Sequence, residues 1–407
     1  MRVGNRIETP ITGKEARSGP IKVLIVCTNS DLAGAPIHVL TLMKGLKTKV
    51  AFSAVFGADG PVAKDLRNEG FEVDIIPELR SKIHFTKDLQ ATIALLGLVK
   101  KRGPDIIHCH STKAGLIGRI VASRLKLPCI FTVHGWGWRG LNIVTSLAGF
   151  LTEWMLARTT NARYIYVSKS VCQVAEKYLR IPSKNGRVIY NGASAVPRSK
   201  HSEKTSMQII MCSRVSPAKD HKSLIMAFEM TNVSARLVLC GGGTEGEKFR
   251  ALAKKWAPSR FEDISFLGER SDVRELIASS DVLAQISHFE ALPLSIIEAM
   301  GSSLPVIATN VGGVAELIDH EKNGILVNRG NIAEIAEAIQ RLSDITFREN
   351  LADKASTKHQ SVFSEQTMLR ETHRYYQFVN AESHWPEAQV LANAEPDERL
   401  VTKVKNK

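Results

Sequence analysis

Short apolar runs alternate with amphipathic stretches along most of this 407-residue chain. An apolar run followed by a helical pattern is typical of β-α-β units, so the alternation predicts an α/β protein built on parallel sheets. In the first half, we predict strands at residues 21–27, 50–56, 72–76, 105–108, 129–133 and 164–167, with residues 187–192 closing the set. In the second half, we predict strands at residues 207–213, 235–240, 264–267, 281–286, 306–308 and 325–327.

A polar stretch, residues 193–206, separates the two sets of strands and is typical of a linker. The chain is long enough for two domains of ordinary size. We expect two Rossmann-like, doubly wound domains that face each other across a cleft, where ligands usually bind. The expected boundaries are a flexible leader at 1–20, an N-terminal domain at 21–195, a C-terminal domain at 206–363, a helix at 364–380 and a mobile tail at 381–407.

The composition, 44% hydrophobic and 23% charged, is that of a soluble globular protein. No run approaches the ~18–20 apolar residues of a membrane-spanning helix, since the most apolar helical candidate, residues 141–157, contains Asn142 and Glu153. The first twenty residues lack the apolar stretch of a secretory signal. The six cysteines have no metal-ligand spacing and are expected to be buried thiols. These features favour a cytoplasmic location.

The net charge of +13 is unevenly distributed. Residues 1–199 contain 29 Lys+Arg and 13 Asp+Glu, a balance of +16, whereas residues 200–407 contain 25 and 28, a balance of −3. A basic surface attracts nucleic acid, an anionic membrane or a phosphorylated substrate. Nucleic acid is disfavoured because no recognised binding module is present. A solvated basic face without any partner remains the simpler alternative.

Two glutamates eight positions apart, Glu290 and Glu298, follow the strand predicted at 281–286. Pro293 between them suits the first turn of a helix. Glu290 is therefore expected on a loop at the carboxyl end of a strand, and Glu298 about two turns into the next helix. Ligands of open α/β sheets bind at this edge, where carboxylates can accept hydrogen bonds from sugar hydroxyls. The alternative is an ordinary strand-helix-strand unit with solvated glutamates.

Two cations, Arg214 and Lys219, follow the first strand of the second half. Arg offers a planar fork and Lys a point charge, a good combination for the oxygens of a diphosphate. Alone, such a pair is weak evidence, because a solvated loop is the default. The chain contains no Asp-x-Asp, so the usual divalent-metal diphosphate site is not expected.

The block from residue 287 to 327 resembles the Glu-x7-Glu region of the retaining GT-B glycosyltransferases of family 4. Residues 213–220 resemble that family's Gly-Arg-x4-Lys-Gly segment, with Ser213 and Asp220 at the flanking glycine positions. Residues 31–38 resemble its glycine-rich first loop, although Pro36 replaces the acidic residue. The likeness covers roughly residues 21–380 and implies the GT-B fold, with a final helix crossing back between the domains.

The resemblance also implies roles for individual residues, which group by the ligand that each would contact. The implied catalytic residues are Arg214, Lys219, Glu290 and His134; the donor-binding ones are Gly34, Arg270, Leu292, Leu294 and Glu298; the acceptor-side ones are His110, Ser111 and Lys113.

The implied activity is metal-independent transfer of a hexosyl or N-acetylhexosaminyl group from a UDP-sugar to a lipid-linked saccharide or other polysaccharide precursor, as in exopolysaccharide and capsule assembly. No cofactor is expected, and the basic half suggests a peripheral position on the inner face of the cell membrane.

Other assignments remain open. A non-hydrolysing UDP-sugar epimerase shares the two-domain plan, and a sugar-nucleotide-binding or scaffolding protein would need no chemistry. Zinc ligation by His108 and His110 lacks an evident third ligand. The Gly-x-Gly-x-x-Gly spacing at Gly241, Gly243 and Gly246 is a weak dinucleotide motif.

Overall fold

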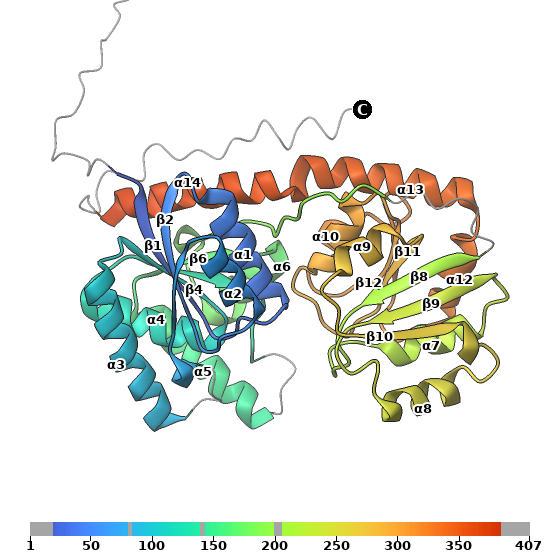
Figure 1. Cartoon of the computed structure of the whole chain (residues 1–407), viewed down its shortest axis with the longest axis horizontal. Coiled ribbons are helices and arrows are strands. Elements are labelled where there is room, and N and C mark those ends of the chain that lie inside the picture. Colours follow the sequence, from blue (N-terminus) through green and yellow to red (C-terminus); the bar gives the residue numbers. More distant parts are fainter. Residues whose placement is uncertain (1–18, 80–83, 139–142, 199–205, 384–407) are drawn as a thin grey trace, which may run out of the picture.

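A computed structural model of the protein describes residues 19–79, 84–138, 143–198 and 206–383. It contains two α/β lobes placed side by side (Figure 1). The predicted leader at 1–20 and tail at 381–407 lie almost entirely outside the described residues.

The N-lobe is built on a seven-stranded sheet in the order β3-β2-β1-β4-β5-β6-β7, and every neighbouring pair is parallel. Its strands are β1 (Ile21–Cys27), β2 (Val50–Phe56), β3 (Glu72–Ile75), β4 (Ile106–His110), β5 (Cys129–Val133), β6 (Ala162–Tyr166) and β7 (Gly186–Val188). Strand β4 ends two residues later than predicted, because His108 and His110 are both fully buried in the sheet despite their polar rings. His110 therefore stands at the carboxyl end of a strand.

The helices of the N-lobe are α1 (Gly34–Leu46), α2 (Pro61–Asn68), α3 (Phe85–Arg102), α4 (Thr112–Leu125), α5 (Ile143–Thr159) and α6 (Lys169–Val174), with the short turns η1 (Pro77–Leu79), η2 (Ala175–Leu179) and η3 (Ser183–Asn185). Helix α1 begins at Gly34, and Pro36 lies in its first turn, where the missing N–H of proline costs nothing.

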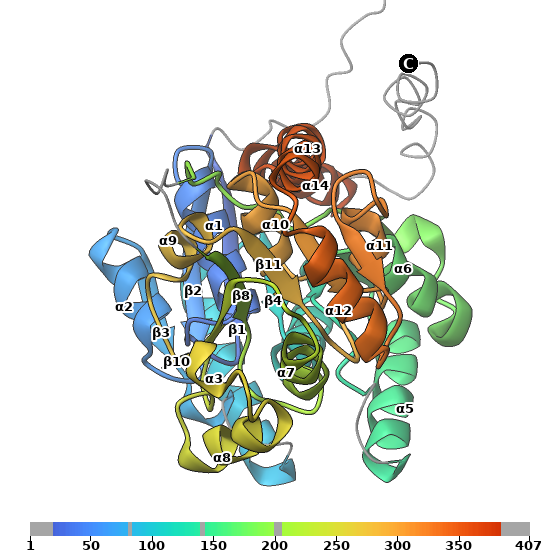
Figure 2. The same ribbon diagram turned by 90° about the vertical axis from the view of Figure 1, so that its right-hand side faces the viewer.

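The C-lobe is built on a six-stranded parallel sheet in the order β10-β9-β8-β11-β12-β13. Its strands are β8 (Met207–Cys212), β9 (Ala235–Cys240), β10 (Ile264–Gly268), β11 (Val282–Gln285), β12 (Val306–Thr309) and β13 (Ile325–Val327). Its helices are α7 (His221–Glu229), α8 (Glu247–Trp256), α9 (Val273–Ala278), α10 (Leu294–Gly301), α11 (Val314–Leu317), α12 (Ile332–Arg341) and α13 (Ile345–Lys358), with the turn η4 (Phe261–Asp263) (Figure 2).

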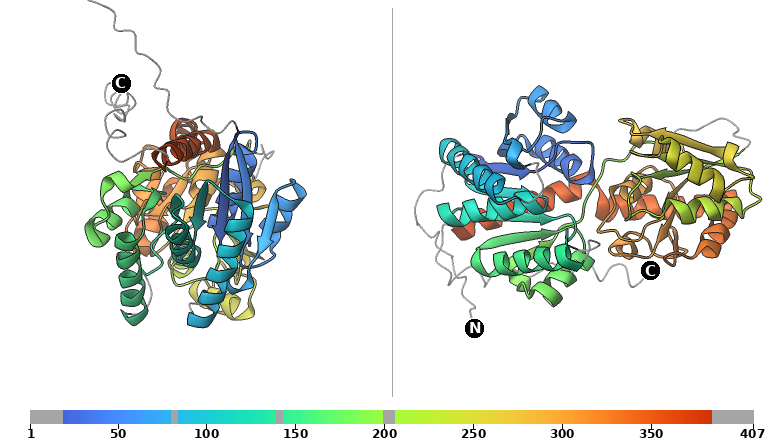
Figure 3. Two further views of the ribbon diagram at one scale, coloured as in Figure 1. Left: turned by 90° about the vertical axis from the view of Figure 1, so that its left-hand side faces the viewer. Right: turned by 90° about the horizontal axis from the view of Figure 1, so that it is seen from below.

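The chain returns to the N-lobe through η5 (His359–Phe363) and the long helix α14 (Glu365–Ser383). Helix α13 packs against α10 of the C-lobe, whereas α14 packs against α1 and β1 of the N-lobe. The two helices follow one another along the same side of both lobes (Figures 1 and 3). Tyr375, Tyr376 and Val379 of α14 belong to the N-lobe core.

Apolar burial holds the two lobes together as well as each lobe by itself. One cluster of buried side chains extends across both lobes and includes Tyr166 and Val167 from the N-lobe and Leu292 and Val314 from the C-lobe. Two doubly wound α/β lobes with shared packing confirm the predicted fold class. Among the described residues, no helix is long and apolar enough to cross a membrane.

Candidate functional site

Each sheet changes winding direction at one place, between β1 and β4 in the N-lobe and between β8 and β11 in the C-lobe. In open α/β sheets, the crevice at the carboxyl ends of such strands binds ligands. Strand β4 ends in His110, and the loops that follow β8 and β11 contain Lys219 and Glu290. The sequence candidates therefore lie at the expected edge of both sheets.

Glu290 is buried at the end of the loop after β11, and one of its oxygens collects three donors. Gln285 Nε2 and Ser287 Oγ each donate to Glu290 Oε1 at 2.7 Å, and the Lys219 ammonium forms an ion pair with the same atom. Buried carboxylates need such compensation. The other oxygen, Oε2, receives no hydrogen bond from the described residues, so it can accept one from a ligand.

Backbone hydrogen bonds join the loop of Lys219 to the loop of Glu290. Asp220 N donates to Ile286 O at 2.9 Å, and His288 N donates to Ala218 O at 2.8 Å. Asp220, which replaces a family glycine, accepts from Ser223 N at 3.1 Å and caps α7. This departure from the family pattern is therefore compatible with a regular loop.

Gly312 allows the next segment to approach the Glu290 backbone. Its φ is +57°, and a Cβ at this position would lie 1.7 Å from Glu290 O. The Gly-rich turn after β9 likewise packs closely against the backbone of the Arg214 loop, because a Cβ on Gly241 would lie 2.4 Å from Ser213 O. These glycines therefore serve close backbone packing. Arg214 itself is exposed and has no ion-pair partner within the described part of the chain.

Glu298 lies in the second turn of α10, about one turn in rather than the two predicted, because the helix begins at Leu294. Arg274 Nε donates to Glu298 Oε1 at 3.1 Å. Burial raises the pKa of the Glu298 carboxyl, and Arg274 opposes that shift. Arg270 is exposed and engages Asp272 at 2.8 and 2.6 Å, so the structure does not bring it into contact with Glu298.

The side of the N-lobe that faces the C-lobe, the N-lobe wall, contains a cluster of histidine rings. His110 Nδ1 and His134 Nε2 are 3.0 Å apart, and the His38 ring on α1 lies 4.9 Å from the His134 ring and 5.5 Å from the His110 ring, centroid to centroid. Burial lowers the pKa of His38 to about 4 and the pKa values of His110 and His134 well below their usual range. The rings are therefore neutral near pH 7. His38 Nδ1 and His110 Nε2 are buried without a hydrogen-bond partner.

The pairing of His108 with His110 as zinc ligands is disfavoured, because both His108 nitrogens are occupied. His108 Nδ1 lies 2.7 Å from Tyr376 Oη on α14, and Nε2 lies 2.7 Å from Thr132 Oγ1. One nitrogen from each of His38, His110 and His134 instead lies within 4.8 Å of the others, a group that could hold a metal ion. Sequence reasoning missed His38, since its helix is remote from the other two histidines in the chain.

Two acceptor-side candidates have structural partners. Lys113 is buried, forms an ion pair with Asp88 at 2.6 Å and donates to Glu78 O at 2.8 Å. Ser111, with φ of +77°, is the N-cap residue that precedes α4, and its Oγ lies 2.7 Å from Thr28 Oγ1. The contacts with Asp88 and Glu78 hold the Lys113 ammonium in place within the N-lobe.

The two walls approach each other where the glycine-rich N-lobe loops meet the loop after Glu290. A Cβ on Gly135 would lie 3.5 Å from Ala291 Cβ, and one on Gly34 would lie 3.9 Å from Leu294 Cδ1. Leu292 is buried, and its carbonyl accepts from Asn191 Nδ2 at 3.1 Å.

A carboxylate of the C-lobe also binds the N-lobe directly. The Glu316 oxygens accept from the backbone N–H groups of Lys169 and Ser170 at 2.8 Å each. This contact places a carboxylate at the N-terminus of α6, where the helix dipole favours negative charge. Glu316 was part of the recognised block, but its partner in the other lobe could not be inferred from it.

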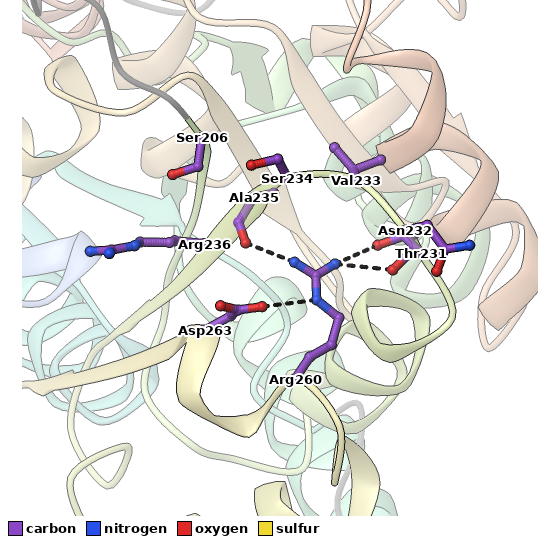
Figure 4. Close-up of a pocket in the computed structure, with 9 residues that line it drawn as sticks. All are labelled: Ser206, Thr231, Asn232, Val233, Ser234, Ala235, Arg236, Arg260 and Asp263. Carbon is purple, nitrogen blue, oxygen red and sulfur yellow. Dashed lines mark hydrogen bonds and ion pairs between the residues drawn. The ribbon is translucent and has the colours of Figure 1, made fainter.

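A polar pocket of about 550 Å³ lies at the amino-terminal edge of the C-lobe sheet, away from these residues (Figure 4). Arg260 crosses it and donates to Ala235 O at 2.8 Å, to Thr231 Oγ1 at 2.9 Å and to Asp263 Oδ2 at 3.1 Å. These bonds occupy the guanidinium and join β9 to its flanking loops, which is a structural role. We therefore assign the candidate site to the carboxyl edges of the sheets.

Two family models match the chain over adjoining regions. The model described as "Glycosyltransferase Family 4" matches residues 32–195, and "Glycosyl transferases group 1" matches residues 195–359. Together they match residues 32–359, which include every candidate residue above.

Two curated relatives illustrate the match. One is the UDP-Gal:alpha-D-GlcNAc-diphosphoundecaprenol alpha-1,3-galactosyltransferase of Escherichia coli, 27% identical over 349 residues, which are 78% of this chain and 89% of the relative. Another is the N-acetyl-alpha-D-glucosaminyl L-malate synthase of Bacillus anthracis, 26% identical over 66% of this chain and 73% of the relative. Neither is an epimerase, so that alternative gains no support.

The crystal structure of Anabaena Alr3699/HepE in complex with UDP-glucose has the same fold, with a TM-score of 0.76 at 21% identity. The likeness covers 88% of this chain and 99% of that one.

Proposed function

The chain belongs to the family 4 glycosyltransferases with the GT-B fold, and from this premise we propose that it transfers a sugar, with retention at the anomeric carbon, from a UDP-sugar to a lipid-linked saccharide or other polysaccharide precursor. The sugar would be of the hexosyl or N-acetylhexosaminyl type.

The observation that carries this proposal is the meeting of Lys219 with Glu290 at the winding reversal of the C-lobe sheet. An ammonium has three N–H donors, so Lys219 can keep its bond to Glu290 and still donate to a phosphate. Arg214 is exposed on the same loop and would contact a second phosphate oxygen. Together they would stabilise the leaving diphosphate, where charge develops in the transition state.

The other contacts to the donor substrate are proposed from the positions of the candidate residues. Glu290 Oε2 would accept from hydroxyls of the donor sugar, and Glu298 from the ribose. His134 would contact the sugar from the N-lobe wall as a neutral imidazole. Gly34, Arg270, Leu292 and Leu294 would surround the nucleotide.

Two findings support a lipid-linked acceptor. The E. coli relative is named for a diphosphoundecaprenol-linked substrate, and residues 1–199 of this chain have a charge balance of +16, which suits an acceptor diphosphate at an anionic membrane surface. His110 and Ser111 would face this acceptor. The enzyme would then act peripherally at the inner face of the cell membrane, in exopolysaccharide or capsule assembly.

A transfer assay over a panel of UDP-sugars, with and without a polyprenyl-diphosphate saccharide, tests the proposal. We expect product only when both substrates are present, with the anomeric configuration of the donor. Epimerisation of a UDP-sugar without acceptor would contradict it, as would inversion at the anomeric carbon.

The same assay with EDTA tests metal independence. We expect transfer to persist, because Arg214 and Lys219 supply the positive charge that a metal would otherwise provide. Loss of activity with EDTA, restored by a transition metal, would assign the His38, His110 and His134 group as a required metal site.

A further inference from the structure

The outer surface of α3, α4 and α5 is unusually apolar for a helical layer facing solvent. These helices lie side by side on one face of the N-lobe sheet, with α4 packed against both neighbours. Nine of the fifteen large hydrophobic side chains exposed in the described part of the protein lie on these three adjacent helices, which makes their outer surface a candidate for contact with a partner. They are Phe85, Leu89 and Ile93 on α3, Ile120 on α4, and Val144, Leu147, Leu151, Trp154 and Met155 on α5.

Helix α5 has apolar side chains on both its inner and its outer side, and its one acidic residue, Glu153, is buried and paired with Arg119. Leu156 is buried against the core, while Val144, Leu147 and Leu151, spaced three and four residues apart, are 77%, 57% and 51% exposed. Residues at this spacing share one helix face. Exposed apolar side chains gathered on one helix face are typical of a contact surface, so the outer face of α5 is suited to a non-aqueous environment.

All the charges available on this layer are positive. The three helices contain two acidic residues, Asp88 and Glu153, and both are paired with inward-facing cations, Lys113 at 2.6 Å and Arg119 at 2.8 Å. The exposed charged residues on the three helices are Lys87, Lys100, Lys101, Arg124 and Arg158. Arg158 also covers the Trp154 ring, with its Cζ 3.8 Å from the ring centroid. Apolar side chains among exposed cations are complementary to an anionic lipid surface.

The layer also has a suitable position. Helices that follow parallel strands begin at the carboxyl edge of the sheet, and Phe85 and Val144, the two most exposed apolar residues, lie at the beginning of α3 and α5. Both helices project past the sheet at the same end of the N-lobe (Figures 1 and 3). That end carries His110 and His134, where the acceptor would enter.

We propose that the outer face of α3, α4 and α5 binds to an anionic lipid bilayer, with the apolar side chains of α5 inserted among the lipid head groups. The inference rests on the lipid-linked acceptor proposed above and specifies the surface and the mode of attachment. Insertion adds an apolar contribution that salt does not screen, unlike the attraction of Lys and Arg to the surface. The N-lobe would thus present its acceptor side to the membrane.

Co-sedimentation with vesicles tests this surface. The full chain should bind vesicles of phosphatidylcholine with phosphatidylglycerol, and a fraction should remain bound at high salt. Leu147→Glu combined with Leu151→Glu should reduce the partition coefficient by about tenfold per leucine, since each loses its apolar burial. Ile345→Glu is the matched control, because Ile345 is 60% exposed on the C-lobe, and it should bind as the unmodified protein does.

Fluorescence quenching by brominated lipids gives a second readout. Quenching should occur with the unmodified protein and fall in Trp154→Phe, because Trp154 lies on the inserted face. Equal vesicle binding by the double leucine variant, or no quenching, would overturn the proposal. A dimer in sedimentation velocity that Leu147→Glu dissociates would overturn it too, assigning the face to a second copy of the chain.

Failure of this inference is distinguishable from failure of the proposed function. UDP binding by thermal shift should be the same in the double leucine variant and in Ile345→Glu. No vesicle binding, together with normal transfer from a UDP-sugar, would reject the membrane surface alone. Absence of nucleoside diphosphate binding in the unmodified protein would reject the proposed function.

Discussion

The facing walls of the two lobes present polar groups in different electrostatic environments. On the C-lobe wall, Lys219 and Glu290 form an ion pair, and the carboxylate receives two further hydrogen bonds. On the N-lobe wall, His38, His110 and His134 are close together but held neutral by burial. A diphosphate needs fixed positive charge, whereas a sugar hydroxyl can bind either a carboxylate or a neutral imidazole. Under the proposed function, the phosphate contacts would therefore come from the C-lobe cations, and both lobes would contact hydroxyls.

The largest effect should come from removing the cations of the C-lobe wall. Lys219→Ala or Arg214→Ala should lower kcat by about 100- to 1000-fold, as expected for a preorganised group that stabilises transition-state charge. Steady-state transfer assays measure this. Lys222→Ala, an exposed lysine at the start of α7, serves as the matched control and should remain fully active. Near-normal turnover in Lys219→Ala would remove the basis of the comparison.

Removing the negative charge of the same wall should have a smaller effect. Glu290→Gln keeps the size of the side chain but weakens charge-assisted hydrogen bonds worth about 1.5–3 kcal/mol, so transfer should fall by roughly 10- to 100-fold. The affinity for free UDP, measured by calorimetry, should change little, because the sugar is the proposed partner. A large loss of UDP affinity would instead place Glu290 beside the nucleotide.

The neutrality of the N-lobe wall predicts a dependence of stability on pH. The pKa of His38 is lowered to about 4 from an unfolded value of 6.5, so the unfolded state binds more protons between these values. Stability is therefore fully present above pH 6.5 and is lost as pH falls toward 4. At pH 5, His38 alone should cost about 2 kcal/mol.

Urea unfolding at pH 7.5 and pH 5 measures this loss. His38→Gln should be less sensitive to the same change of pH than the unmodified protein. If both proteins lose the same unfolding free energy between pH 7.5 and pH 5, His38 is protonated in the folded state at pH 5. The N-lobe wall would then be charged, as the C-lobe wall is.

On the C-lobe wall, Glu298 is the proposed contact of the ribose, and Glu290 is the proposed contact of the donor sugar. A variant of Glu298 tests whether the two contacts are separate. Glu298→Ala should weaken UDP binding by about tenfold, corresponding to one hydrogen-bonded contact of about 1.4 kcal/mol. Glu275→Ala is the control, since Glu275 is an exposed glutamate of the neighbouring helix α9. If both variants bind UDP equally well, Glu298 serves only to hold Arg274.

The smallest effect is expected at Gly34, where the two walls approach each other. A Cβ would meet only Leu294 Cδ1 at 3.9 Å, and Ala is favoured over Gly in a helix by up to about 1 kcal/mol. Gly34→Ala should therefore raise the free energy of unfolding slightly while raising KM for the donor, if a phosphate approaches this backbone. Increased stability with unchanged KM would exclude the contact.

The strands were the most predictable elements. Residues 21–27, 50–56 and 129–133 form β1, β2 and β5 at the predicted bounds, because strands buried on both faces read as continuous apolar runs. The placement of Glu290 after a strand followed from the same pattern. Strand β4 was less predictable, since buried histidines interrupt the apolar run.

The sequence by itself determined the α/β class, the two-lobe plan and the edge of each sheet at which polar residues gather, because local periodicity and strand order depend on neighbours in the chain. The tertiary structure alone decided that Lys113 faces Asp88, that His38 joins His110 and His134, and that the outer face of α5 is exposed. These outcomes depend on how helices distant in sequence dock on the sheet, and side-chain direction there is set by packing rather than by local pattern.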